Sequence, residues 1–200
     1  MIIKYKLPEF VIFITLGAFF GLASKYLDNI AVEEGDMWLE ALSYFGDLST
    51  RLGIWVLLAT FIAAFSKTFV ESAINTFLFF VAMLFTYYLY SAYLFGFFPF
   101  RYLIIWGALA IASPLFAMIA WEAKNNERRS LLLPALPMGL MLSLSLGMGL
   151  FYIHLNYIEE LIMYFILALI FYRSPKQMAI VIVLSFVVGF IIEQVSPFHF

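Results

Sequence analysis

The chain has 200 residues, of which 65% are hydrophobic, 20% aromatic and only 12% charged. A soluble domain carries roughly 25% charged residues, so this composition excludes a water-soluble globule and a disordered chain. The lack of cysteine excludes a disulfide framework, and a formal net charge of −2 argues against binding to nucleic acid. We therefore expect an all-α fold, a polytopic transmembrane helical bundle.

Seven stretches of the sequence are long and apolar enough to be expected to cross a bilayer. A spanning helix needs about 20 mostly apolar residues, because the hydrocarbon is about 30 Å thick. The predicted spans cover residues 9–26, 51–67, 68–95, 101–121, 130–151, 153–172 and 177–194. They are apolar all round, which favours helices over the strands of a membrane barrel. We expect residues 1–200 to form a single transmembrane domain.

The basic residues predict that the N-terminus lies inside and the C-terminus outside. Short loops rich in Lys and Arg stay in the cytoplasm. With this threading the inner side holds Lys4, Lys6, Lys67, Lys124, Arg128, Arg129, Arg173 and Lys176, and the outer side holds Lys25, Arg51 and Arg101. The first stretch also has the pattern of a cleaved signal peptide, which would leave six spans.

The connection over residues 28–50 is predicted to lie outside and to contain a short helix. Trp38, Leu42 and Phe45 fall on one helical face, with Asp36 and Glu40 largely elsewhere. This pattern is typical of a helix lying on the membrane surface. A packed lid or a plain loop fits the same residues equally well.

Small residues predict where helices approach one another closely. Lipid supplies no hydrophobic drive between helices, so their association depends on van der Waals fit at small side chains. The residues concerned are Gly17, Gly21, Gly139, Ser143 and Gly147. Pro134 and Pro137 also interrupt the start of the stretch 130–151, which we therefore expect near the centre of the bundle.

Two adjacent carboxylates in the stretch 153–172 are the most informative polar residues. Twelve uncharged residues separate Glu160 from Arg173 and rise about 18 Å in a helix, which is less than the hydrocarbon thickness. If Arg173 reaches the inner surface, Glu159 and Glu160 lie at or inside the outer edge of the hydrocarbon. A carboxylate there is costly, which favours a ligand- or proton-binding role. An interfacial helix start, where acidic residues suit the helix dipole, is the alternative.

Other polar residues on the predicted outer side could converge with these carboxylates. Asn156 and Tyr164 share a helical face with Glu160, at steps of four residues. The remaining candidates for ligand binding are His154, Lys25, Asp28, Arg51 and Arg101. Taken singly, each is typical of a residue at headgroup level. Tyr87, Tyr90 and Tyr93 fit an aromatic belt at the interface better than a pocket wall.

The sequence carries none of the common catalytic signatures. Two His and no Cys argue against a Cys/His metal site, and the HExxH, GxSxG and GxxxxGK[ST] patterns are absent. We expect no catalytic residue, no metal and no cofactor. A lipid-modifying enzyme that used His154 with Glu159 or Glu160 is the alternative.

Two short segments resemble an uncharacterised family of small multi-spanning bacterial integral membrane proteins. The segments are Ser-Lys-Tyr-Leu-Asp-Asn at residues 24–29 and Gly-Phe-Phe-Pro at residues 96–99. The resemblance implies a multi-pass protein of a bacterial plasma membrane and no activity that could be carried over. In size and helix content the chain is also loosely similar to the substrate-binding subunits of vitamin transporters, which have about six spans.

We therefore expect a membrane protein that binds a small molecule or ion from the outer side, with a transport subunit as one form of this role. An accessory protein that binds a membrane protein partner and has no ligand of its own is the alternative. Its contact surfaces would be the Gly/Ser face of the stretch 130–151 and the segment 28–50. The lipid bilayer is an expected partner and nucleic acid is not.

Overall fold

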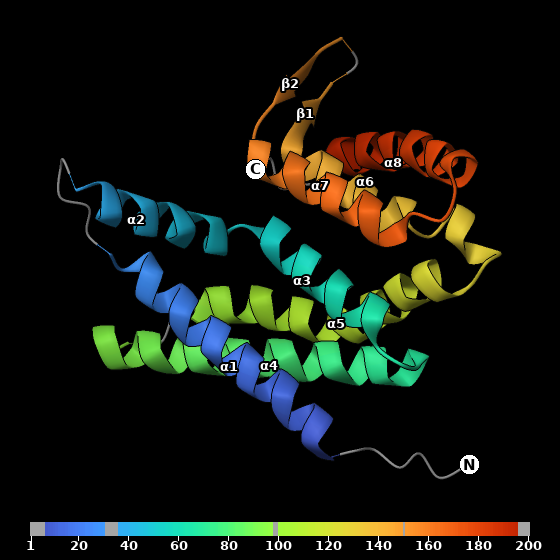
Figure 1. Cartoon of the computed structure of the whole chain (residues 1–200). Coiled ribbons are helices and arrows are strands. Elements are labelled where there is room, and N and C mark those ends of the chain that lie inside the picture. Colours follow the sequence, from blue (N-terminus) through green and yellow to red (C-terminus); the bar gives the residue numbers. More distant parts are fainter. Residues whose placement is uncertain (1–6, 31–35, 98–99, 150, 196–200) are drawn as a thin grey trace. The chain divides into compact units, whose positions relative to one another are not determined.

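The computed structural model describes residues 7–30, 36–97, 100–149 and 151–195, and the side chains from residue 10 onward (Figure 1). Within these ranges the chain forms eight α-helices, one short 3-10 helix and one hairpin of two strands. It divides into two compact parts, which we describe separately. Unit 1 comprises Met1–Arg51 and Ala73–Phe116, and unit 2 comprises Leu52–Ser72 and Ala117–Phe200.

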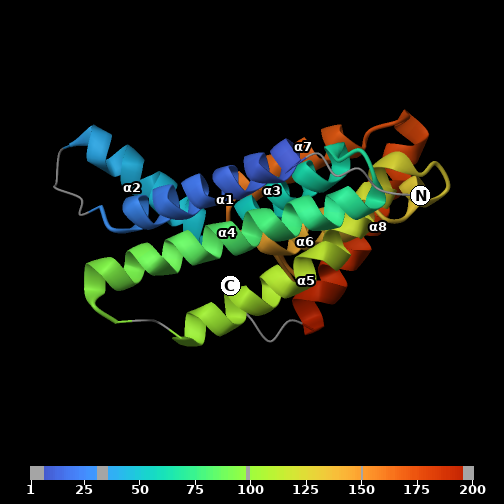
Figure 2. The same ribbon diagram turned by 90° about the horizontal axis from the view of Figure 1, so that it is seen from below.

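Unit 1 is organised by a close parallel contact between α1 (Leu7–Asp28) and α4 (Phe69–Phe95). A Cβ added at Gly17 would lie 2.2 Å from the carbonyl oxygen of Phe79, and one at Gly21 would lie 2.2 Å from that of Met83. Both helices advance by four residues between these contacts, so they run in the same direction (Figure 2). The expectation that Gly17 and Gly21 mark a close helix contact is confirmed.

The segment 28–50 contains a helix, as expected, which is α2 (Met37–Thr50). The carboxylate of Asp36 caps its first turn and accepts hydrogen bonds from the backbone N–H of Trp38 at 2.9 Å and of Leu39 at 3.3 Å. Gly46 packs against α1, where an added Cβ would lie 2.7 Å from the carbonyl oxygen of Leu27. The helix is thus folded onto the end of α1.

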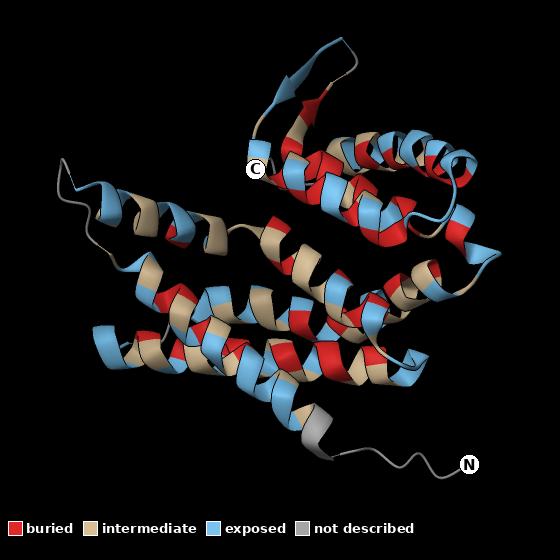
Figure 3. Ribbon diagram, in the orientation of Figure 1, coloured by how far each residue is buried: buried red, intermediate tan, exposed pale blue. Residues whose placement is uncertain are grey.

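Unit 2 is built around α6 (Ala135–Ser145), which packs on α7 (Ile158–Phe171) and α8 (Pro175–Val195). Every residue of α6 from Met141 to Ser145 is buried (Figure 3). A Cβ at Gly139 would lie 2.6 Å from Cγ1 of Val188, so the small residue lets α8 approach. The prediction of a central position for this helix is confirmed within unit 2.

The predicted helix over 130–151 is wrong beyond Ser145, where a hairpin replaces it. Strand β1 (Leu146–Met148) pairs antiparallel with β2 (Ile153–Leu155), and Gly147 stands opposite His154. A Cβ at Gly147 would lie 2.2 Å from the His154 ring. Glycine is a poor helix former, and the two glycines between Ser145 and residue 151, Gly147 and Gly149, favour the extended backbone over the helix we expected. The predicted start of the next helix at residue 153 is also wrong, because residues 153–155 pair with β1 and α7 begins at Ile158.

Side-chain donors close the end of α3 (Leu52–Phe65) in unit 2. The indole N–H of Trp121 donates to the carbonyl oxygen of Ser66 at 2.9 Å, and the amide of Asn125 donates to that of Ala64 at 3.2 Å. Both donors belong to α5 (Phe100–Asn125). The Ala64 carbonyl belongs to the last turn of α3, where carbonyls have no partner inside the helix, and Ser66 directly follows the helix.

The same pattern joins the ends of α5, α7 and α8 in unit 2. The Lys124 ammonium donates to the carbonyl oxygen of Ile170, and the Arg173 guanidinium donates to that of Lys124. The Gln177 amide donates to the carbonyl oxygen of Ser130 at 2.8 Å, within the short helix η1 (Arg129–Leu131). These bonds bring the end of α3, the end of α5, the end of α7 and the start of α8 to one end of the unit.

Four helices in the described residues are long and apolar enough to cross a membrane. They are Phe10–Asp28, α4, α5 and α8, and the bent pair of α2 and α3 would make a fifth. The predicted count of seven is not supported, because α3 and α7 have 14 residues each and α6 has 11. A helix of 14 residues rises only about 21 Å. The all-α class and the membrane character of the chain stand.

We expect Gly17→Ala to destabilise the protein by about 1–3 kcal/mol, because the new methyl group would clash with the α4 backbone. The matched control is Gly107→Ala, since a Cβ at Gly107 meets no atom within 4 Å. Unfolding in detergent, followed by tryptophan fluorescence, measures both variants. Equal stability of the two would contradict the close contact of α1 with α4.

Candidate functional site

The predicted site residues divide between the two units. Unit 1 contains Lys25, Asp28, Arg51 and Arg101, and unit 2 contains His154, Asn156, Glu159, Glu160 and Tyr164. The structure brings together two smaller groups, one in each unit. One is built on Lys25 and Asp28, and the other on Glu160 and Tyr164.

Lys25 and Asp28 form an ion pair at the end of α1. The ammonium Nζ lies 2.7 Å from Oδ2 of Asp28, and Lys25 is 7% exposed. The ammonium also lies 5.3 Å from the ring centre of Tyr87 and 5.0 Å from that of Phe95, both on α4. The Tyr87 hydroxyl donates to Oδ2 of Asp28 at 3.1 Å. A carboxylate and two aromatic faces thus hold one buried ammonium, and they fasten α1 to α4.

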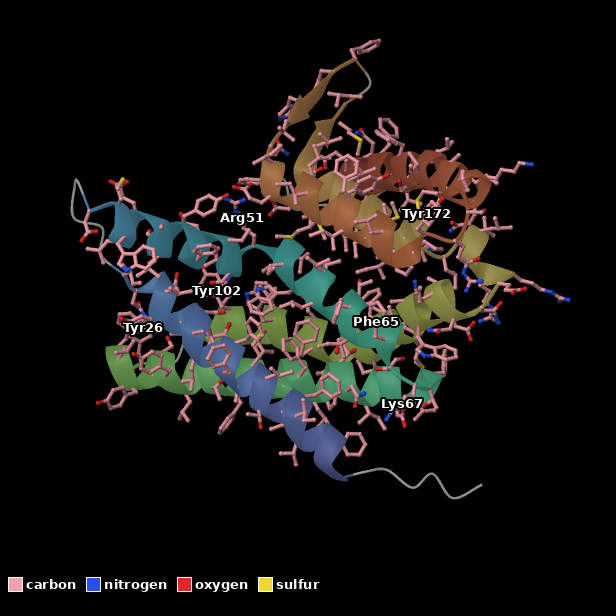
Figure 4. The ribbon with its side chains drawn as sticks, viewed as in Figure 1. Tyr26, Arg51, Phe65, Lys67, Tyr102 and Tyr172 are labelled. Atoms are coloured by element: carbon pink, nitrogen blue, oxygen red, sulfur yellow. The ribbon has the colours of Figure 1, made fainter. Side chains whose placement is uncertain are left out.

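The two arginines predicted for the site lie at the end of α2 and at the start of α5. Arg51 is half-buried and follows α2 as its C-cap, where its backbone N–H donates to Leu48 at 3.3 Å (Figure 4). Arg101 is exposed in the first turn of α5. Their predicted role in ligand binding stays a prediction.

Glu160 is the buried carboxylate of unit 2, with 1% of its surface exposed. It stands in the first turn of α7, where α7 packs on α3. A Cβ at Gly53 of α3 would lie 2.7 Å from Cγ of Glu160 and 3.2 Å from its Oε1. The missing side chain at Gly53 therefore makes the space that the carboxylate occupies. The neighbouring Glu159 is only half-buried, so the two carboxylates differ, as their 100° separation on a helix predicts.

A second polar contact lies one turn further along the buried face of α7. The Tyr164 hydroxyl and the Ser185 hydroxyl of α8 are 2.9 Å apart, and both residues are buried. The sequence analysis missed Ser185, although a serine within the apolar run of α8 is a detectable signal. We name Glu160, Tyr164 and Ser185 the polar strip of unit 2.

Asn156 and His154 belong to the hairpin and its base. The backbone N–H of Asn156 donates to the carbonyl oxygen of Ser145 at 2.8 Å, which closes the hairpin. The exposed His154 ring stacks on Tyr152 with 5.6 Å between the ring centres and covers Gly147. These contacts supply no acidic partner for a catalytic histidine. Among the described residues, no group of three or more His, Cys, Asp and Glu could hold a metal ion.

Comparison with known protein families, with curated proteins and with solved structures finds no match to this chain. The resemblance of residues 24–29 and 96–99 to a bacterial membrane family therefore stays a prediction, and residues 98–99 lie outside the described part.

We expect Asp28→Asn to destabilise the protein by about 2–3 kcal/mol, because it leaves the buried Lys25 ammonium without its carboxylate. The value is below that of a fully buried pair, since the Asp28 side chain is 29% exposed. The double variant Lys25→Met/Asp28→Asn should recover most of the loss, because it removes the unpaired charge as well. Detergent unfolding measures all three proteins, and a single variant as stable as the wild type would contradict a stabilising pair.

Proposed function

We propose that this integral membrane protein binds a small molecule or ion from the outer side, through Glu160. The observation that carries the proposal is the burial of this carboxylate in a chain with several helices long and apolar enough to cross a membrane. An ionisable residue in such surroundings is expensive to maintain and marks a functional site by default. A helix-weakening glycine at position 53, which gives the carboxylate its space, supports the same interpretation.

The chemistry of the polar strip favours a cation or a protonated amine as the ligand. A carboxylate attracts positive charge, and this attraction is stronger in a buried position than in water. The hydroxyl groups of Tyr164 and Ser185, one turn away, add neutral oxygen atoms of the kind that hard cations prefer. A role as the binding subunit of a transport system is the extension of this proposal.

We expect Na⁺ or K⁺ to raise the unfolding temperature of the purified wild-type protein in a concentration-dependent way. N-methylglucamine chloride at equal ionic strength is the reference salt. At 100 times the dissociation constant a ligand adds about 2.7 kcal/mol of stability, which corresponds to several degrees. Glu160→Gln should abolish the shift, because it removes the charge that the cation binds.

Glu159→Gln is the matched control, since it makes the same change at the neighbouring, half-buried residue. It should keep the wild-type response. Gly53→Ala should weaken the response, because the added methyl group displaces the Glu160 side chain. An unchanged shift in Glu160→Gln, or no shift in the wild type with either cation, would contradict the proposal.

We further propose that the chain crosses a bacterial plasma membrane seven times, with its N-terminus in the cytoplasm. Besides the four long helices, the three short helices α3, α6 and α7 would then each account for one crossing. Support comes from the end of unit 2 where hydrogen bonds link the ends of α3, α5 and α7 and the start of α8. The connections at this end carry six basic residues that are predicted to be internal: Lys67, Lys124, Arg128, Arg129, Arg173 and Lys176. Figure 4 labels Lys67 just beyond the end of α3.

Single-cysteine variants test this threading, because the chain has no cysteine of its own. We expect Met37→Cys, which is 83% exposed in the wild type, to react with an impermeant maleimide in intact cells. Lys176→Cys, exposed at the start of α8, should react only after the cells are permeabilised. Labelling of both variants in intact cells, or the reverse pattern, would contradict the proposed orientation.

For the alternative of an accessory protein, one of the two expected contact surfaces, the Gly/Ser face of the stretch 130–151, packs inside unit 2. Gly139 and Ser143 of α6 are buried within unit 2, where Gly139 faces α8. The segment 28–50 remains available for a membrane protein partner, because Met37 and Trp38 of α2 are 83% and 76% exposed.

A further inference from the structure

The hairpin of unit 2 is apolar and exposed, which is unusual for a turn in water. Residues 146–157 contain no Lys, Arg, Asp or Glu. Phe151 is 98% exposed, Ile153 66% and Tyr152 62%, while Met148 on β1 is buried. Strand β1 is thus mostly buried, and every residue of strand β2 is exposed (Figure 3). Exposed apolar groups of this size mark an interaction surface.

A hydrogen bond fixes the level of the hairpin along the spanning helix α8. The Gln194 amide donates to the carbonyl oxygen of Met148 at 3.0 Å. Helix α8 has 21 residues, and its rise of about 31 Å equals the thickness of the hydrocarbon. Gln194 is in its last turn, so β1 lies where α8 leaves the hydrocarbon, at the end opposite to the basic loops.

The hairpin adjoins the start of α7 and projects to the side of this helix (Figure 1). One face of α7 is apolar and exposed along its length, through Ile158, Ile162, Phe165 and Leu169. Strand β2 ends at Leu155, three residues before Ile158, so the exposed apolar residues of the hairpin lie at the start of this row.

We infer that the hairpin of residues 146–149 and 151–157 binds lipid beside the start of α7, with Phe151, Tyr152 and Ile153 inserted into the outer leaflet. The strand edges lie at the boundary where headgroups and water can bond to the backbone. Tyr and His suit this level because their rings have polar atoms. The inference does not depend on ligand binding at Glu160, so either can fail without the other.

The test is a spin label at Phe151→Cys in nanodiscs of phosphatidylcholine and phosphatidylglycerol. Phe151 is 98% exposed, so the substitution removes no packing inside the unit. Leu169→Cys, 76% exposed on the apolar row of α7, is the reference for lipid, and Arg128→Cys, on an exposed loop residue, is the reference for water. Power saturation compares the access of oxygen, which concentrates in lipid, with that of a water-soluble nickel complex.

We expect the oxygen-to-nickel ratio at Phe151→Cys to approach that at Leu169→Cys and to exceed that at Arg128→Cys several times. A ratio equal to that of Arg128→Cys would place the hairpin in water and overturn the inference. An immobile label with little access to either reagent would mean that protein covers the hairpin, which also overturns it. Tyr152→Cys, labelled in the same way, shows whether the result holds for the adjacent residue.

Discussion

Helix ends leave carbonyl groups that have no partner inside the helix, and in unit 2 side chains of neighbouring helices bind several of them. Trp121 and Asn125 donate to the end of α3, and Lys124 donates to the end of α7. Each helix ends near the start or end of a neighbour that carries the needed donor. These donors bind carbonyls at the C-terminal ends of α3 and α7, at the end of unit 2 that carries the basic loops. Positive charge at these ends also suits the helix dipoles.

The helical class and the close contacts of the fold were predictable, because both follow from local composition. A glycine in an apolar helix favours close packing, because the missing side chain lets a neighbouring helix approach. Gly17, Gly21 and Gly139 all lie at such contacts. The hairpin was not predictable in the same way. Its residues are as apolar as a spanning helix, and only the pair Gly147 and Gly149 gave a hint of the break. Hydropathy measures the solvent that a segment prefers and does not distinguish a helix from a strand.

The candidate site was predicted residue by residue with uneven success. The depth argument found Glu160, because the distance to Arg173 follows from the sequence alone. It could not find Gly53 or Ser185, since their approach to α7 depends on how α3 and α8 pack. Likewise, the pairing of Lys25 with Asp28 is a local helical spacing, whereas Tyr87 and Phe95 join them from a segment about 60 residues away.

The parallel packing of α1 on α4 has a consequence for biosynthesis. Two helices that run in the same direction cannot enter the bilayer together as a hairpin. The glycine face of α1 can therefore pack only after α4 has been inserted. Gly17 and Phe79 are separated by a long stretch of chain that has to be translated first. During that interval the face of α1 with Gly17 and Gly21 contacts lipid or the insertion machinery. The assembly of unit 1 is therefore late and non-local, while α6, α7 and α8 can associate as they emerge.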